Sequence, residues 1–206
     1  MFDSGISVNN LIRELKNTEI DIALEIPNAT YVSWLNSLQH LLYTEIIKEQ
    51  RKCTLAPSPD NLLLISNIST GYNEEKPRFE DIHAVYAGET QLIKSTLASG
   101  VIFPNTFYKY QNHIGYNTEE APSELTIVYF VKPALVQVTA NDEINDTWVN
   151  VMVPIEFIDL VKAKLRGEAY KLANEDSLAA KWLNDYNTLL ETFRAWVAEK
   201  SPNFGL

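Results

Sequence analysis

The stretch VPIEFIDLVKAKLRGEAYKLANEDSLAAKWLNDYNTLLETFRAWVAEK, residues 153–200, decides the fold. Pro154 stands where a proline is favoured in the first turn of a helix, because its ring presets φ and its missing N–H is not needed there. Apolar residues then recur three and four positions apart, which predicts a helix with one apolar face. The polar break 173–177 follows, in which Asn174 or Asp176 is a suitable N-cap for a second helix. That second helix is predicted to carry a broad apolar stripe made of Ala179, Trp182, Leu183, Tyr186, Leu189, Leu190, Phe193, Trp196 and Val197.

The first part of the chain also favours helices. Ser7 is a natural N-cap for a short helix over residues 7–15. A longer helix is predicted from Asn28 or Thr30 to about Lys52, with apolar residues at helical spacing. Segment 20–26 fits either a strand by its alternation or a helix by its composition. Because isolated helices depend on packing for stability, we expect the long helix to pack against the pair in 153–200.

The middle of the chain differs from both ends in its residue composition. It opens with the turn-rich sequence 56–61, APSPDN, and then contains short runs rich in β-branched and aromatic residues. Such runs favour strands. Strands are predicted at 62–65, 82–86, 91–94, 107–110 and 125–131, and Ala87-Gly88-Glu89 is predicted to be a hairpin turn.

These patterns predict an α+β fold. The N- and C-terminal helices, roughly 7–52 and 153–200, are expected to form a helical bundle with a β-rich insertion between them. The corresponding domain boundaries are 1–53 for the first helices, 54–152 for the insertion, and 153–206 for the helical hairpin with its tail.

Composition and charge limit the function classes. The 206 residues carry 17 basic and 27 acidic side chains, giving a formal net charge of −10. A protein that binds DNA by charge needs clustered Lys and Arg, which are absent here. The single cysteine, Cys53, excludes a disulfide within these residues, and with three scattered histidines it disfavours a zinc site. Neither a membrane-spanning run nor signal-peptide features occur, so we expect a soluble protein made in a reducing cytoplasm.

Few residues are arranged for chemistry. His83 and Asp81 are two positions apart on a predicted strand and are the best acid–base pair, but no nucleophile motif accompanies them. Cys53 follows two basic residues, which favour the thiolate, but it lacks an identifiable His and Asn set. The run 141–143, Asn-Asp-Glu, has only part of a calcium loop, which favours solvated loop charge. The sequence therefore predicts a protein that is not an enzyme and has no cofactor, with a hydrolase using His83 and Asp81 as the open alternative.

Several stretches resemble segments of the head–tail connector (adaptor, or neck) proteins of tailed bacteriophages. The resemblance lies in the order of the segments and in their residue patterns rather than in a catalytic signature. It covers nearly the whole chain. It is carried by Tyr31–Leu38, Phe79–Tyr86, Leu125–Pro133, Val153–Phe157, Leu165–Tyr170 and Ala179–Tyr186.

The resemblance implies a structural virion protein assembled in the cytoplasm of a bacterial host. Such proteins form a ring, commonly twelve-fold, that docks beneath the portal protein and seats the next neck or tail protein. DNA passes through the lumen of the ring without specific binding, which the net charge of −10 suits. No membrane contact is implied. Another phage structural role, such as a tail-completion or capsid-associated protein, is the alternative.

Four apolar residues are the candidate interface. Trp182 and Trp196 belong to a stripe that is broader than one small bundle needs, and tryptophan is enriched at protein interfaces. Phe204 and Leu206 lie in the tail 201–206, where exposed apolar side chains are unfavourable unless they bind something. For the tail, a portal contact and a frayed end remain open.

Overall fold

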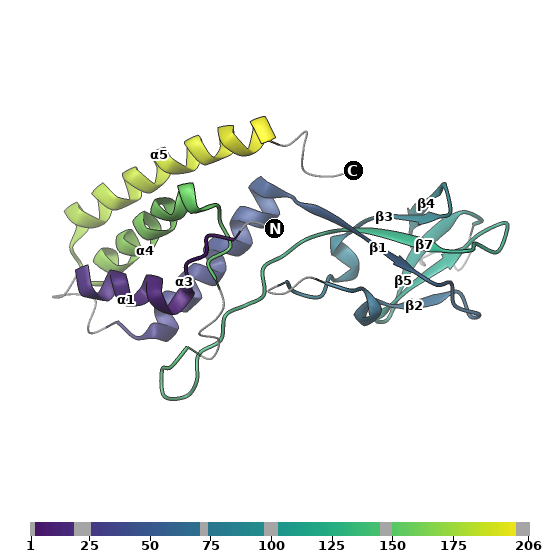
Figure 1. Ribbon diagram of the computed structural model, residues 1–206, viewed down its shortest axis with the longest axis horizontal. Helices are drawn as coiled ribbons and strands as arrows, with labels where there is room; N and C mark the ends of the chain where they lie inside the picture. Colours follow the sequence, from purple (N-terminus) through teal and green to yellow (C-terminus); the bar gives the residue numbers. More distant parts are fainter. Residues whose placement is uncertain (1–2, 19–25, 71–73, 97–102, 145–149, 201–206) are drawn as a thin grey trace. The chain divides into compact units, whose positions relative to one another are not determined.

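The computed structural model describes residues 3–18, 26–70, 74–96, 103–144 and 150–200. It divides into two compact units (Figure 1). Among the described residues, the helical unit contains the chain up to Ile47 and again from Pro133 to Lys200, and the sheet unit contains Lys48–Lys132. The predicted segment 20–26 lies outside the described residues except for Ile26, which is buried.

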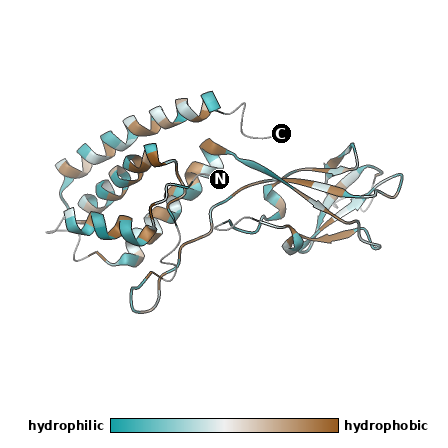
Figure 2. Cartoon of the chain, viewed as in Figure 1, coloured by the Kyte–Doolittle hydropathy of each residue, from teal (hydrophilic) through white to brown (hydrophobic). Residues whose placement is uncertain are grey.

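The helical unit is built from amphipathic helices whose apolar stripes turn inward. In Figure 2 apolar and polar bands alternate along the long helices, as expected for elements with one buried face. Its described elements are α1 (Val8–Thr18), α3 (Asn28–Leu41), the π-helix η1 (Leu42–Ile47), the 3-10 helix η5 (Ile155–Phe157), α4 (Ile158–Leu172) and α5 (Asp176–Lys200).

The hairpin of α4 and α5 confirms the two helices predicted in 153–200. Its core includes Phe193, which has no exposed surface. The break between the helices differs from the prediction in one detail. Asn174 adopts a left-handed conformation with φ 61, and its N–H and that of Glu175 donate to the carbonyls of Lys171 and Tyr170. Asn174 therefore ends α4 in a Schellman motif, rather than capping α5.

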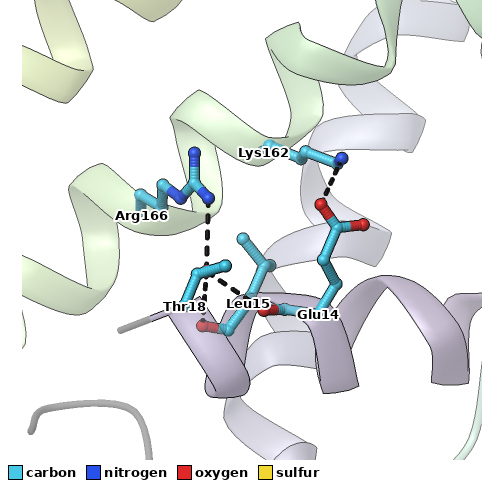
Figure 3. Close-up of polar contacts among 5 residues, drawn as sticks. All are labelled: Glu14, Leu15, Thr18, Lys162 and Arg166. Carbon is cyan, nitrogen blue, oxygen red and sulfur yellow. Dashed lines mark hydrogen bonds and ion pairs between the residues drawn. The ribbon is translucent and has the colours of Figure 1, made fainter. Parts of the chain in front are cut away.

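Helix α1 begins where the sequence predicted. The Ser7 hydroxyl accepts a hydrogen bond from the N–H of Asn10 at 3.2 Å, as an N-cap does. Polar contacts tie the outer face of α1 to α4 (Figure 3): Lys162 Nζ lies 2.6 Å from Glu14 Oε1, and Arg166 donates to the Thr18 hydroxyl at 3.3 Å. The buried face is made of the predicted apolar residues, Val8, Leu11, Ile12 and Leu15.

The sheet unit is a curled, mixed, seven-stranded sheet with the order β1-β7-β3-β4-β5-β6-β2. All neighbouring strands pair antiparallel except β4 and β5, which are parallel. Gly88, with φ 59, supplies the left-handed conformation that the predicted β3–β4 hairpin turn needs. The strands are β1 (Gln50–Leu55), β2 (Leu62–Leu64), β3 (Ile82–Ala87), β4 (Thr90–Ser95), β5 (Thr106–Tyr110), β6 (His113–Asn117) and β7 (Leu125–Phe130).

The long helix predicted to reach Lys52 is wrong in its last part. The α-helix gives way to a π-helix after Leu41, and Lys48 adopts φ 50, which ends the helical run. The chain then continues as β1, which pairs with β7 from Gln50↔Phe130 to Leu55↔Leu125. Pairing across the chain outweighs the weak local helix preference of these residues.

The predicted fold class, a helical bundle with a β-rich insertion, is therefore wrong. The structure is α+β, with the curled sheet in the middle of the chain and helices before and after it. The apolar stripes of the helices correctly indicated which helix faces are buried. They do not specify which other element covers each face. Residues 133–138, which have neither helix nor extended-sheet pairing, lie along α3 and line one side of it.

Candidate functional site

An open groove runs along α3 in the helical unit. Its volume is about 830 Å³, and its lining comes from α3, the start of η1, and the segment 135–138. The apolar part of the lining is formed by Val32, Leu41, Leu135, Val136 and Val138. Two of these side chains are unusually accessible for leucine, since Leu41 is 42% exposed and Leu135 is 53% exposed.

Asn36 holds the second wall of the groove in place. Its side-chain amide donates from Nδ2 to the carbonyl of Val136 at 2.9 Å, and its Oδ1 accepts from the N–H of Val136 at 3.0 Å. This pair of bonds satisfies both backbone groups of a residue outside any strand, which a partly buried chain requires. Asn36 therefore positions segment 135–138 beside α3, although 100 residues separate the partners.

Asp142 fixes the first turn of α3. Pro27 at the N-cap makes no side-chain cap, and the carboxylate of Asp142 instead accepts from the N–H groups of Asn28 and Ala29, both at 2.8 Å. The Asn28 side chain donates to the Asp142 carbonyl at 2.7 Å. A negative charge at this position also complements the helix dipole. The prediction that 141–143 is merely solvated loop charge is therefore wrong for Asp142.

The same contacts lower the pKa of Asp142. Desolvation raises the pKa of the carboxyl, but the hydrogen bonds from Ala29 and Asn28 and the positive charge of Lys16 outweigh it and hold the pKa below the ordinary 3.8. A carboxyl whose folded pKa is lowered contributes stability above its unfolded pKa and loses it as the pH falls through the folded pKa. The contribution of Asp142 is therefore full near neutral pH and disappears in acid.

We expect Asp142→Ala to reduce the free energy of unfolding of the helical unit by about 1 kcal/mol at neutral pH, the usual effect of a lost cap. Asp142→Asn keeps an acceptor and tolerates the left-handed backbone at this position (φ 63), so its loss is expected to be smaller. Urea unfolding followed by tryptophan fluorescence measures both. The exposed neighbour Asn141→Ala is the control. The deficit of Asp142→Ala should shrink as the pH is lowered through the pKa of the Asp142 carboxyl, and a deficit that is the same at neutral and at acid pH would show that the cap is not electrostatic.

The groove suits an apolar chain segment better than a reacting substrate. Two of its three hydroxyl groups are already committed to the helix, since Ser37 donates to the Ser33 carbonyl and Thr44 to the His40 carbonyl, both at 2.9 Å. His40 and Glu45 contribute titratable groups to the lining. The groove therefore offers a hydrophobic floor with a polar rim, which is the anatomy of a protein interface.

The two candidate tryptophans lie on the α4–α5 hairpin and are partly exposed. Trp182 is covered on one face by Arg166, whose guanidinium lies 4.6 Å from the ring centroid, and Lys181 lies 5.3 Å from it. Trp196 packs edge-on to Phe157 at 5.4 Å and stacks with Phe193 at 6.2 Å. Each tryptophan therefore has partners in its own chain while part of the ring stays accessible.

The other two candidate interface residues, Phe204 and Leu206, lie outside the described residues.

The structure does not bring His83 and Asp81 into an acid–base pair. Asp81 is buried in the 3-10 turn Phe79–Asp81, where it accepts from the N–H of Arg78 at 2.8 Å and lies 2.5 Å from Lys132 Nζ. His83 is exposed at a register shift in β3, and its ring lies edge-on to Phe130 at 5.3 Å. Asp81 is thus engaged in holding the turn and the end of the sheet.

The other residues considered for catalysis or metal binding are not placed for either role. Cys53 lies in β1 opposite Ile127 and is half-buried, rather than at a helix end. Within the described ranges, no group of three or more His, Cys, Asp or Glu side chains is placed to hold a metal ion. Sequence reasoning missed the groove, Asn36 and the capping role of Asp142. No local pattern marks them, because their partners lie about a hundred residues away.

Comparison with known proteins identifies no family. No protein-family model matches the chain, and no curated protein matches it. Among the helices of the described part of the chain, none combines the length and apolar character needed to cross a membrane.

Proposed function

We propose that the chain is a structural protein of a tailed-phage virion, an adaptor that forms a ring beneath the portal. In this role it joins the portal to the tail or to the next neck protein, and DNA passes through the lumen without being bound specifically. The virion is then its final location, reached after assembly in the bacterial cytoplasm.

The observation that carries the proposal is the apolar surface that a single copy leaves uncovered. Leu41 and Leu135 lie open in the groove, and Leu172 and Leu178 are 57% and 39% exposed beside the turn between α4 and α5. Clusters of exposed apolar side chains are uncommon on monomers and mark surfaces that other proteins cover. A ring subunit needs such surfaces on more than one side, because each copy contacts two neighbours.

The order of segments along the chain supports the same proposal. The stretches that resemble adaptor proteins fall in α3, in the turn and strand 79–86, in β7, and in the α4–α5 hairpin. The net charge of −10 suits a channel wall, since clustered positive charge would retain the phosphate backbone.

The test is a phage in which the gene for this chain is silenced, observed by electron microscopy of lysates. An adaptor predicts normal heads and normal tails that accumulate as separate particles, rescued by the wild-type chain. Malformed heads indicate a capsid-associated role, and tails that are themselves unfinished indicate a tail-completion role. Either of these outcomes contradicts the adaptor assignment. Rescue by a His83→Ala variant is also expected, and failure of that rescue favours the hydrolase alternative.

A further inference from the structure

We infer that neighbouring copies pair edge to edge through their sheets, with β1 of one copy hydrogen-bonded antiparallel to β2 of the next. The inference rests on the proposed ring, because it specifies how one subunit meets another. It uses the two strands that end the sheet, which the order β1-β7-β3-β4-β5-β6-β2 leaves with one neighbouring strand each. An edge strand presents backbone donors and acceptors that can pair with another chain.

The outer edge of β1 presents the backbone groups of alternate residues. The N–H of Val131 donates to the Glu49 carbonyl at 2.9 Å, so these two residues form a hydrogen-bonded pair. In an antiparallel register such pairs recur at every second residue. The N–H and C=O groups of Gln50, Lys52 and Thr54 therefore point away from β7, and no other described residue bonds to them. The side chains of Lys52 and Thr54 are exposed, so this edge is accessible.

The outer edge of β2 is shorter and offers three backbone groups. The N–H of Tyr116 donates to the Asn61 carbonyl at 3.1 Å, so by the same alternation Leu62 and Leu64 face away from β6. The N–H of Leu62 is held by the Asp60 carboxylate at 3.3 Å. Within the described ranges, the C=O of Leu62 and both backbone groups of Leu64 have no partner.

These three groups match three outward groups of β1. With Leu64 opposite Gln50, the two residues exchange two hydrogen bonds, as an antiparallel pair does. Leu62 then lies opposite Lys52, and its C=O accepts from the Lys52 N–H. The fourth group of this second pair, the Leu62 N–H, is the one that Asp60 already holds.

The directions of the two edge strands favour a contact that repeats around a ring. Five of the six adjacent strand pairs are antiparallel, so β1 and β2 run in opposite directions through the sheet. Copies that keep one orientation about a rotation axis can then pair β1 of each copy with β2 of the next as antiparallel strands. A head-to-tail contact of this kind gives a ring when the rotation closes.

Charge favours β2, rather than a second β1, as the partner of β1. Two β1 strands pair antiparallel only about a two-fold axis, and the registers that keep most of the strand paired place the two Lys52 side chains directly or diagonally opposite. Like charges facing each other across strands are destabilising. Asp60, in contrast, is exposed and lies two positions before Leu62. A diagonal neighbour of this kind is about 7–8 Å away, within reach of a long side chain such as that of Lys52.

The first test exchanges the two charges. Self-association of the full chain is measured by sedimentation velocity over a series of protein concentrations. We expect Lys52→Glu and Asp60→Lys each to weaken association about tenfold, since each places like charges together at the contact. The double variant Lys52→Glu/Asp60→Lys should recover most of the loss, because its two charges are again opposite.

A matched control separates the edge from net charge. Lys109→Glu makes the same change of charge on β5, which is an interior strand, and the Lys109 side chain is 53% exposed. Its surface ion pair with Glu80 contributes little to stability, so this variant should associate as the wild type does. A wild-type chain that stays monomeric at every concentration, or a double variant that associates no better than the single ones, overturns the inference.

The second test removes one backbone donor from the edge. Lys52→Pro deletes an N–H that faces away from β7, which an edge strand tolerates. Lys52→Thr removes the same charge but keeps the N–H, and we expect it to associate more strongly than Lys52→Pro. Unchanged hydrogen exchange in β7 peptides checks that β1 still pairs with β7. Equal association of the two variants overturns the inference, and if the proline disturbs β7 the charge exchange alone decides.

The outcomes also separate this inference from the proposed function. If the wild-type chain forms a ring on the portal but the charge exchange has no effect, the edge assignment fails and the adaptor role stands. If the edge variants behave as expected but the chain never associates with portal protein, the adaptor role fails and the contact between copies stands.

Discussion

Replacing Phe193 by alanine is expected to reduce the free energy of unfolding of the helical unit by about 4 kcal/mol. Phe193 is completely buried in the α4–α5 hairpin. Its ring lies 4.8 Å from that of Phe157 in an edge-on arrangement and stacks with Trp196. Truncation removes the transfer free energy of the ring, leaves a cavity between α5 and η5, and removes two aromatic contacts.

Tryptophan fluorescence measures this change in the appropriate unit. All four tryptophans of the chain, Trp34, Trp148, Trp182 and Trp196, lie outside the sheet unit 48–132, so their transition in urea follows the helical unit. Phe193→Leu, which keeps most of the volume, is the matched control and should lose less than about 1.5 kcal/mol. A loss for Phe193→Ala no larger than for Phe193→Leu would mean that the aromatic cluster is not part of the core.

The second large effect is expected in the sheet unit, where Arg51 compensates buried acidic groups. Its Nη1 lies 2.7 Å from Glu74 Oε1, and its Nε lies 3.7 Å from Glu49 Oε1. The Glu74 side chain is only 1% exposed, and that of Glu49 is 12% exposed. Removing the guanidinium from a buried carboxylate is strongly destabilising, because the remaining charge loses its compensation in a poorly solvated site.

We therefore expect Arg51→Met to reduce the stability of the sheet unit by about 3 kcal/mol. Hydrogen exchange measured by mass spectrometry on peptides from β1 and β7 reports the change, since Arg51 lies opposite Tyr129 in that strand pair. The double variant Arg51→Met/Glu74→Gln should recover much of the loss, because the more deeply buried of the two carboxylates, with its closer contact to Arg51, is then replaced by a neutral amide. Equal losses for the single and double variants would show that the ion pair is not the cause.

Local patterns were sufficient to predict the parts of the fold that depend on local interactions. The α4–α5 hairpin follows from a proline start, apolar spacing and a polar break, and α1 follows from Ser7 and its apolar face. The β3–β4 hairpin follows from strand residues around Gly88. In each of these cases the partner is close in sequence or the apolar pattern alone specifies the element.

The parts that were missed depend on distant partners. Strand β1 carries charged residues and continues an apolar helical stripe, and only pairing with β7 makes it a strand. Strand β6 contains Gly115, which is depleted in strands, yet the ring of Tyr108 lies where a Cβ at this position would be. The groove wall and the cap of α3 come from Val136 and Asp142, which no local pattern connects to α3. The fold-class error has the same origin, since apolar stripes predict burial but not the partner.

The central claim is that copies of this chain assemble into an adaptor ring on the portal. The most direct measurement is the mass, by native mass spectrometry, of the complex formed when the purified wild-type chain is mixed with portal protein of the same phage. The adaptor role predicts one complex in which the number of adaptor copies is fixed and matches the symmetry of the portal ring. If the chain stays monomeric and no complex with portal forms over a range of salt and protein concentrations, the central claim is contradicted.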